Sequence, residues 1–329
     1  MTGTDPPPPA RSFARLAGAA IGTMLGDALG MPVEGWPPER IRAVHGRVER
    51  LLPGRLPAGS YTDDSQMMIA ILETLAHRGR LDPAYLAGRF LALYQPERGY
   101  GGRMAEVMRR IGQGLPWEQV GSDSWGNGGA MRVGPLGAVY PEEPDALLGA
   151  ALAQCRVTHH HPRALAGAAA LALGVGLACR LGARGEKPRP RDFVDHLADR
   201  VEGIDSHLAQ RLRAMPPLEP GREDQARAAL IAAYARDVSA AEAMPAALGA
   251  FLAAENAPQA VILAVSLGGD ADTIAAMTGA LAGAYWGREA WPGDWLAGLE
   301  SGDRGRDHVL TLCHDIIEQK GVDESRSGC

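Results

Sequence analysis

The feature that most constrains the fold of this 329-residue chain is its helical periodicity, in segments dominated by alanine, leucine and glycine. Apolar residues recur at helical spacing, whereas the alternating valine, isoleucine and aromatic residues typical of strands are scarce. Small residues on several helix faces favour close helix packing, and sustained heptads are absent. We therefore predict an all-α fold, a single compact orthogonal helical domain. The expected helices span about 12–29, 64–77, 83–93, 104–111, 145–155, 162–181, 191–202, 206–213, 223–236, 240–253, 257–265, 272–286 and 307–319.

The two ends of the chain differ in composition from the rest. Residues 1–10 contain four consecutive prolines, Pro6 to Pro9, and are expected to form a disordered lead-in. Residues 321–329 are expected to form a polar C-terminal tail. No linker between these ends is long enough to divide two domains, so residues 11–320 are expected to form one all-α domain.

Composition and charge exclude several classes of protein. The net charge of −6 argues against a nucleic-acid binder, and no nucleic-acid partner is expected. The four cysteines form no CxxC pair and are expected to be reduced thiols. The longest apolar run, 164–179, is shorter than the roughly 20 residues that span a bilayer, and we find no signal peptide. We expect a cytoplasmic protein without a membrane partner; monomer is favoured as its oligomeric state, which the sequence does not determine.

Two acidic stretches stand where helices are expected to begin. Thr62-Asp63-Asp64 and Asp270-Ala271-Asp272-Thr273 each combine two carboxylates with a hydroxyl, and an apolar run follows each. Either stretch alone is equally consistent with N-capping and with the positive end of the helix dipole. Together, on two core helices, they are expected to meet in one cleft, where four carboxylates need cations. Oxygen ligands of this kind favour Mg²⁺, Mn²⁺ or Ca²⁺ over zinc.

A glycine-rich loop and a run of histidines are further candidates for a binding site. The loop Gly126-Asn127-Gly128-Gly129 exposes backbone N–H groups that can hold phosphates, with Arg132 nearby as a charge partner, although Asn-Gly is also a common turn. The consecutive residues His159, His160 and His161 are poorly spaced for one metal. We expect His159 to hydrogen-bond a ligand.

These segments resemble the ADP-ribosylglycohydrolase family, which includes ADP-ribosylarginine hydrolases and the dinitrogenase reductase-activating glycohydrolase. The matching segments occur in family order over about 260 residues, and the last is the most specific. They are GDALGMPVE at 26–34, YTDDSQ at 61–66, WGNGGAMRVGPLG at 125–137, THHHP at 158–162 and SLGGDADTIAAMTGALAGAYWG at 266–287.

The resemblance implies the all-α fold of that family, with two Mg²⁺ or Mn²⁺ ions in a central cleft. It implies Glu34, Asp63 and Asp272 as the catalytic residues, with Glu34 beside the metals as ligand, gate or base. The implied metal ligands are Thr62, Asp63, Asp64, Asp270, Asp272 and Thr273. The implied substrate-binding residues are Asn127, Gly128, Gly129, Ala130, Met131 and His159.

The function that follows is metal-dependent removal of ADP-ribose from a modified protein side chain, arginine first among the acceptors, by cleavage at C1″ of the distal ribose. The partners would be an ADP-ribosylated protein as substrate and ADP-ribose as product. Trp36 and Trp125 are candidates for stacking on adenine, and core packing is an equal alternative for both.

Three alternatives remain at this stage. The first is the same chemistry on Ser-linked, O-acetyl- or nucleic-acid-linked ADP-ribose. The second is a non-catalytic module that binds ADP-ribose or a toxin as an immunity protein, which the complete acidic motifs disfavour. The third is an unrelated helical di-metal phosphohydrolase or prenyl-diphosphate enzyme, but Asp63-Asp64-Ser65-Gln66-Met67 lacks the third acid of a DDxxD motif.

Overall fold

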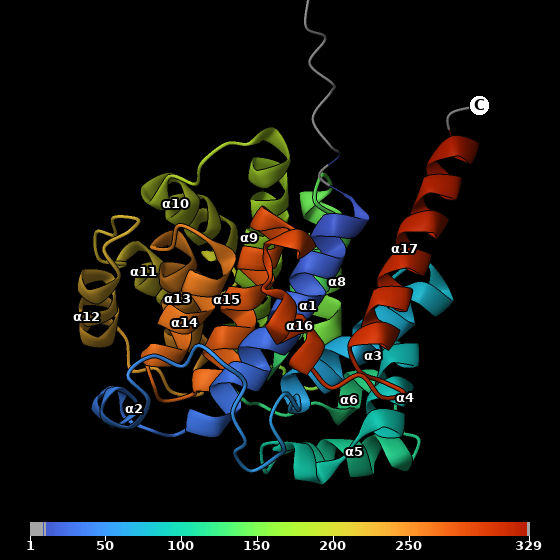
Figure 1. Ribbon diagram of the computed structural model, residues 1–329. Coiled ribbons are helices and arrows are strands. Elements are labelled where there is room, and N and C mark those ends of the chain that lie inside the picture. Colours follow the sequence, from blue (N-terminus) through green and yellow to red (C-terminus); the bar gives the residue numbers. More distant parts are fainter. Residues whose placement is uncertain (1–8, 10, 328–329) are drawn as a thin grey trace, which may run out of the picture.

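The computed structural model describes residue 9 and residues 11–327, with side chains as far as residue 320, and this part of the chain is all-α (Figure 1). The α-helices are α1 Phe13–Gly30, α2 Pro38–His45, α3 Asp63–Arg78, α4 Pro83–Leu93, α5 Met104–Gly112, α6 Trp117–Val120, α7 Gly134–Val139, α8 Pro144–Arg156, α9 Pro162–Arg184, α10 Pro190–Val201, α11 Ser206–Arg213, α12 Glu223–Ala233, α13 Ala240–Leu252, α14 Ala257–Ser266, α15 Ala271–Trp286, α16 Gly293–Gly298 and α17 Arg306–Ser327. Short 3₁₀ turns are η1 Met31–Val33, η2 Pro96–Arg98, η3 Asn127–Gly129 and η4 Arg288–Ala290.

The all-α prediction is confirmed, and each expected helical segment coincides with a helix. The described residues contain no strand, only isolated bridges that pair Ser122 with His159 and Gly126 with Ser239. The helices that the periodicity missed, α2, α6, α7 and α16, are eight residues or shorter, a length at which an apolar period is weak, although α11, also of eight residues, was predicted. The backbone of α17 stays helical into the segment expected as a tail. Of the expected lead-in, only residue 9 is described.

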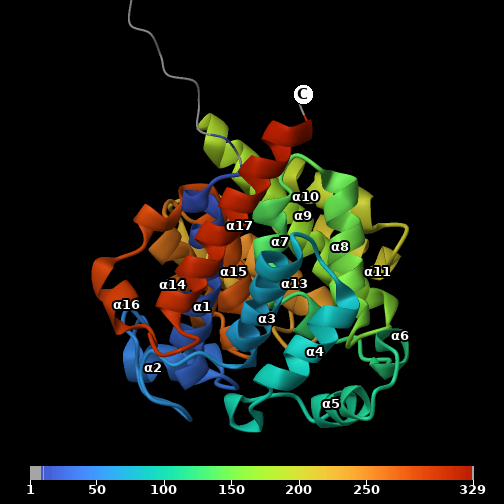
Figure 2. The same cartoon turned by 90° about the vertical axis from the view of Figure 1, so that its right-hand side faces the viewer.

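The centre of the molecule is the contact between α1 and α15, which lie side by side in both views (Figures 1 and 2). Glycines at four-residue spacing on α1 make this approach close. A Cβ added to Gly22 would lie 2.1 Å from the carbonyl oxygen of Gly279, and one added to Gly26 would lie 2.0 Å from that of Ala275. At the end of α1, a Cβ on Gly30 would lie 2.4 Å from the Cα of Asp272. The glycine row therefore lets α1 pack closely against α15 as far as the first turn of α15, which carries Asp272.

Two helices in this core resemble membrane spans by length and composition alone. They are residues 13–33 and α9, and 94% and 83% of their apolar windows are buried inside the protein. The apolar run 164–179 thus belongs to the packed interior helix that the sequence predicted.

The close contact yields a stability prediction. Gly22→Ala should lower the free energy of unfolding by about 1–3 kcal/mol, because α1 and α15 must separate to admit the methyl group. Urea unfolding followed by circular dichroism measures the change. Gly88→Ala on α4 is the control: its Cβ meets nothing within 4 Å, so greater helix propensity should leave stability equal or higher. Equal stabilities for Gly22→Ala and the parent protein would contradict this account of the contact.

Candidate functional site

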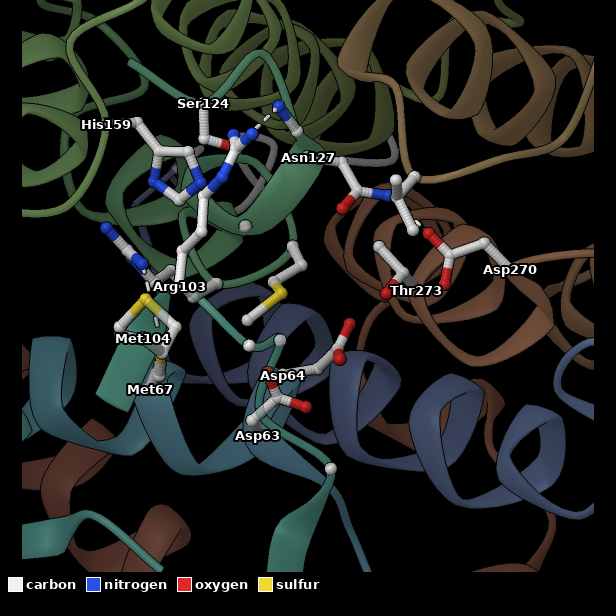
Figure 3. A pocket seen from close by; sticks show the side chains of 18 of the residues that line it. Asp63, Asp64, Met67, Arg103, Met104, Ser124, Asn127, His159, Asp270 and Thr273 are labelled. Atoms are coloured by element: carbon white, nitrogen blue, oxygen red, sulfur yellow. Dashed lines mark hydrogen bonds between the residues drawn. The ribbon is translucent and has the colours of Figure 1, made fainter. Parts of the chain in front are cut away.

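The acidic side chains come from the first turns of two helices that end at one cavity. Thr62 is the extended residue before α3, so Asp63 and Asp64 fall in its first turn. Asp270 precedes α15, and Asp272 lies in that helix's first turn. All four carboxylates line a cavity of about 390 Å³, and Figure 3 shows Asp63 and Asp64 facing Asp270 and Thr273. The predicted meeting of the two acidic stretches is therefore found in the structure.

The donor atoms in this acidic end suit a hard divalent cation. Carboxylate oxygens of Glu34, Asp270 and Asp272 lie within 4.8 Å of one another. Thr62 Oγ1 donates to Asp64 Oδ2 at 3.2 Å, whereas Asp64 Oδ1 is buried without a hydrogen-bond partner among the described residues. A buried carboxylate oxygen without a partner is costly unless a cation binds it. The cluster contains neither histidine nor cysteine, which disfavours zinc.

Burial in this acidic group shifts the pKa of each carboxyl upward. Desolvation, followed by the charges of Asp272 and Asp27, raises the pKa of Asp63 to about 8. Desolvation and the charge of Asp272 raise the pKa of Asp270 to about 7. The pKa of Asp64 lies well above its usual value for the same reasons. The site thus gathers negative charge that protons or cations must balance.

One arginine from the loop between α2 and α3 reaches this end of the cavity. Arg55 Nη1 forms an ion pair with Glu34 Oε2, and Nη2 lies 3.5 Å from Asp272 Oδ2. Its guanidinium also lies against Gly99, where an added Cβ would be 2.3 Å from Nη2. Arg55 lowers the pKa of Asp272, opposing the larger desolvation effect that raises it. Nothing in the sequence singled out this residue among many arginines.

A fifth aspartate, Asp27 of α1, holds the first turn of α3 by hydrogen bonds. Asp27 is fully buried in α1 and accepts hydrogen bonds from Thr62 N at 3.0 Å, Ser65 N at 3.1 Å and Ser65 Oγ at 2.6 Å. These bonds fix the backbone of the turn that carries Asp63 and Asp64. Asp27 was not among the predicted site residues, although it is the single acid in the segment 13–30, whose other residues are apolar apart from Arg15 and Thr23, and this was a usable signal.

The glycine loop forms the opposite wall of the cavity. Asn127, Gly128 and Met131 line it, and Asn127 Nδ2 donates to Asp270 Oδ2 at 2.5 Å, which joins the loop to the acidic end. Gly129 and Ala130 are buried behind this lining. A Cβ on Gly129 would meet Cys155 Sγ at 2.3 Å, whereas one on Gly128 would meet His159 Cε1 at 2.9 Å. Gly128 is therefore the loop glycine that faces His159.

His159 lines the cavity near Gly128, and Arg103 lies at the same end (Figure 3). Desolvation first, and then the charge of Arg132, lowers the pKa of His159 to about 3, so the ring is neutral. Arg132, expected as a charge partner for phosphate, is instead fully buried and bonds to protein groups. Arg103 is the exposed cation here, a residue that the sequence analysis missed.

Some of the remaining residues that the sequence proposed for the site line the cavity, and others do not. Trp125 lines the cavity and is 42% exposed. Trp36 does not line it and instead stacks on His45, with Arg40 3.8 Å over its ring. His160 Nε2 lies 3.1 Å from the carbonyl oxygen of Arg156, and His161 caps α9, so only His159 of the three faces the cavity.

Comparison with known proteins agrees with this geometry. The profile of the ADP-ribosylglycohydrolase family matches residues 8–326. An uncharacterized protein of Archaeoglobus fulgidus is 33% identical over 85% of this chain and 90% of its own length. ADP-ribosylhydrolase ARH3 of Mus musculus is 29% identical over 94% of each chain. The structure is also similar to a chain of a solved ADP-ribosylglycohydrolase-related protein complex, with a TM-score of 0.72 and 30% sequence identity. The similarity covers 93% of this chain and 98% of that chain. The chain belongs to the ADP-ribosylglycohydrolase family.

Proposed function

We propose that this protein is a metal-dependent hydrolase that releases ADP-ribose from a modified acceptor by cleaving the bond at C1″ of the distal ribose. The observation that carries the proposal is one cavity with carboxylates at one end and a glycine loop with a neutral histidine at the other. Membership of the family and the likeness to an ADP-ribosylhydrolase support it.

Two Mg²⁺ or Mn²⁺ ions at the acidic end would be held by Asp63, Asp64, Asp270, Asp272 and Thr273, which line the cavity, and by Thr62, which is buried beside Asp64. The partnerless Asp64 Oδ1 and the all-oxygen donor set support this assignment. Bound there, the ions would supply Lewis-acid attraction for ribose hydroxyls and for a water.

The protein's own residues have distinct roles in the proposed reaction. Water adds to C1″ as the bond from C1″ to the acceptor breaks, and the acceptor leaves with a proton. The carboxylates of Asp63 and Asp272 face the positive charge that develops on the ribose and stabilise it. Glu34, at the exposed mouth, is the candidate base that takes the proton from water once its ion pair with Arg55 opens.

The other end of the cavity suits the rest of the ADP-ribose molecule. Gly128 permits close approach of a diphosphate to the loop backbone, and Arg103 supplies an exposed positive charge. Trp125, partly exposed in the cavity lining, offers a flat surface for adenine.

Two classes of acceptor are compatible with the acidic end. Arginine, the acceptor that the sequence favoured, would bring a guanidinium that Glu34 could pair with. Arg55 already occupies that position, and its positive charge opposes a second guanidinium. This observation favours the alternative of an oxygen-linked, uncharged acceptor such as serine or an acetyl group.

The test is an incubation of the protein with arginine- and serine-ADP-ribosylated peptides in Mg²⁺ or Mn²⁺, with detection of free ADP-ribose. We expect release that EDTA abolishes. Asp63→Asn should reduce the rate by at least about a hundredfold through lost charge stabilisation, with an unchanged helical spectrum. Asp224→Asn on α12 is the control, since this acid lies outside the cavity. Full turnover by Asp63→Asn, or with EDTA present, would reject the metal mechanism.

The raised pKa values predict that cation binding releases protons. Since the pKa of Asp63 is about 8 and that of Asp270 about 7, the metal-free site holds protons at neutral pH. The folded state then binds more protons than the unfolded chain, whose aspartates titrate near 3.9, so metal-free stability should fall as pH rises from about 4 to 8. Mn²⁺ binding should strengthen over the upper part of that range.

Calorimetry at pH 7 in two buffers of different ionisation enthalpy counts the released protons. We expect a measurable release that is smaller in Asp63→Asn. A Mn²⁺ binding enthalpy that does not depend on the buffer would contradict the protonated metal-free site.

Arg55 is expected to oppose cation binding. Arg55→Gln should raise Mn²⁺ affinity about threefold to tenfold, because it removes a positive charge that pairs with Glu34 and Asp272. Titration calorimetry measures this. Arg47→Gln is the matched control, because Arg47 pairs with Glu49 and Glu223 outside the cavity and should bind Mn²⁺ like the parent protein. Equal or weaker binding by Arg55→Gln would exclude this role.

A further inference from the structure

A chain of hydrogen bonds connects a buried arginine to the histidine in the cavity. Arg132 Nη2 lies 2.8 Å from Thr158 Oγ1, and that oxygen lies 2.7 Å from His159 Nδ1. The backbone around this chain is held on both sides, because Ser122 N donates to the carbonyl of Thr158 and His160 N donates to that of Ser122. The three side chains therefore meet in a fixed arrangement.

The direction of each hydrogen bond in this chain follows from the available protons. A guanidinium has no acceptor, so Arg132 donates to Thr158 Oγ1. The threonine hydroxyl has one proton, which can go to His159 Nδ1 or to the carbonyl of Cys155 at 3.4 Å. That carbonyl already accepts from the backbone N–H groups of Thr158 at 3.0 Å and His159 at 2.8 Å. The bond to Nδ1 is the shorter of the two, and Nδ1, unlike this carbonyl, accepts no other hydrogen bond among the described residues. The hydroxyl therefore donates to Nδ1.

Arg132 reinforces this direction electrostatically. Its guanidinium is fully buried, with Gln154, Thr158 and Met67 as its hydrogen-bond partners and no carboxylate within ion-pairing distance among the described residues. This charge, which lies 4.6 Å over the ring of Phe90, disfavours an N–H dipole directed toward it and opposes a second positive charge on the ring of His159. Arg103 and His160 add smaller effects of the same sign on the pKa of His159.

We propose that Thr158 and Arg132 are positioning residues that hold His159 as the tautomer protonated at Nε2, with this N–H directed into the cavity as a donor to an anionic oxygen of the ligand. The nitrogen Nε2 has no hydrogen-bond partner within the described part of the chain and lies near Gly128, on the cavity wall. The inference has two parts. The ligand half, that the Nε2 proton is donated to the ligand, rests on the proposed function, in which the diphosphate occupies that end. The tautomer half, that Nε2 carries the proton, does not depend on the proposed function.

The tautomer can be read directly from the protein without a ligand. Long-range ¹H–¹⁵N correlation spectra of protein labelled with ¹⁵N-histidine distinguish a protonated ring nitrogen from an unprotonated one, and the signals missing from His159→Gln identify His159. We expect Nδ1 of the parent protein to be an unprotonated acceptor and Nε2 to be protonated at pH 7. A proton on Nδ1 would overturn the inference.

Two variants test whether Thr158 sets the tautomer. Thr158→Val removes the hydroxyl at nearly constant volume and should give a mixed population, with the two nitrogen signals shifted toward each other. Thr158→Ser restores a hydroxyl and should restore the single tautomer. Thr74→Val is the control, because Thr74 is equally buried but bonds only to the carbonyl of Ala70 on its own helix. An unchanged tautomer in Thr158→Val would overturn the role of Thr158.

Titration with ADP-ribose tests the ligand half. Thr158→Val should bind ADP-ribose about threefold to tenfold more weakly, because only the fraction of rings protonated at Nε2 can donate to the ligand, with Mn²⁺ affinity unchanged. Equal ADP-ribose affinity in Thr158→Val and the parent protein would overturn the donor role. If the parent protein binds no ADP-ribose, the proposed function and the ligand half fail together, while the spectra still decide the tautomer.

Discussion

The mutual repulsion of carboxylates confined to one end of a cavity is the constraint on which the rest of the structure depends. Asp63, Asp64, Asp270 and Asp272 all lie there, and burial makes their charges more costly. The fold offsets part of this cost by placing them in the first turns of α3 and α15, where helix dipoles favour negative charge. Arg55 offsets a further part. The negative charge that remains must be balanced by protons or cations.

Holding these charges together requires rigid support, which the glycine row of α1 provides. Gly26 and Gly30 let α1 approach the first turn of α15 closely, while Asp27, between them in sequence, accepts hydrogen bonds from the first turn of α3. One helix thus fixes both acidic turns. This arrangement explains why a segment of small apolar residues contains a single, fully buried acid. A side chain larger than glycine would displace α15 and the position of Asp272 together.

Sequence reasoning succeeded where local signals are strong. Helical periods and the polar residues at 62 and 270 predicted α3, α15 and the long helices, because a polar residue at a helix start and an apolar face are local properties. Neither Thr62 nor Asp270, however, forms a capping hydrogen bond with its side chain. The positions of Arg55, Arg103 and Arg132 could not be predicted in this way. Each is one arginine among many in the sequence. Only tertiary packing decides that Arg55 enters an ion pair, that Arg103 is exposed and that Arg132 is buried without a carboxylate partner among the described residues.

The cavity therefore separates two kinds of electrostatic environment. At neutral pH without cations, protons neutralise much of the negative charge of the acidic end, whereas the opposite end carries the exposed charge of Arg103 and the buried charge of Arg132. Under the proposed function, the positive end favours the diphosphate of ADP-ribose beside His159, and the uncharged ribose then lies at the acidic end. Because the pKa of His159 is lowered to about 3, its ring adds no charge at this end, and Arg103 and Arg132 supply the positive charge there. The proposed orientation of the ligand therefore rests on the two arginines, to which the neutral ring adds a hydrogen-bond donor and no charge.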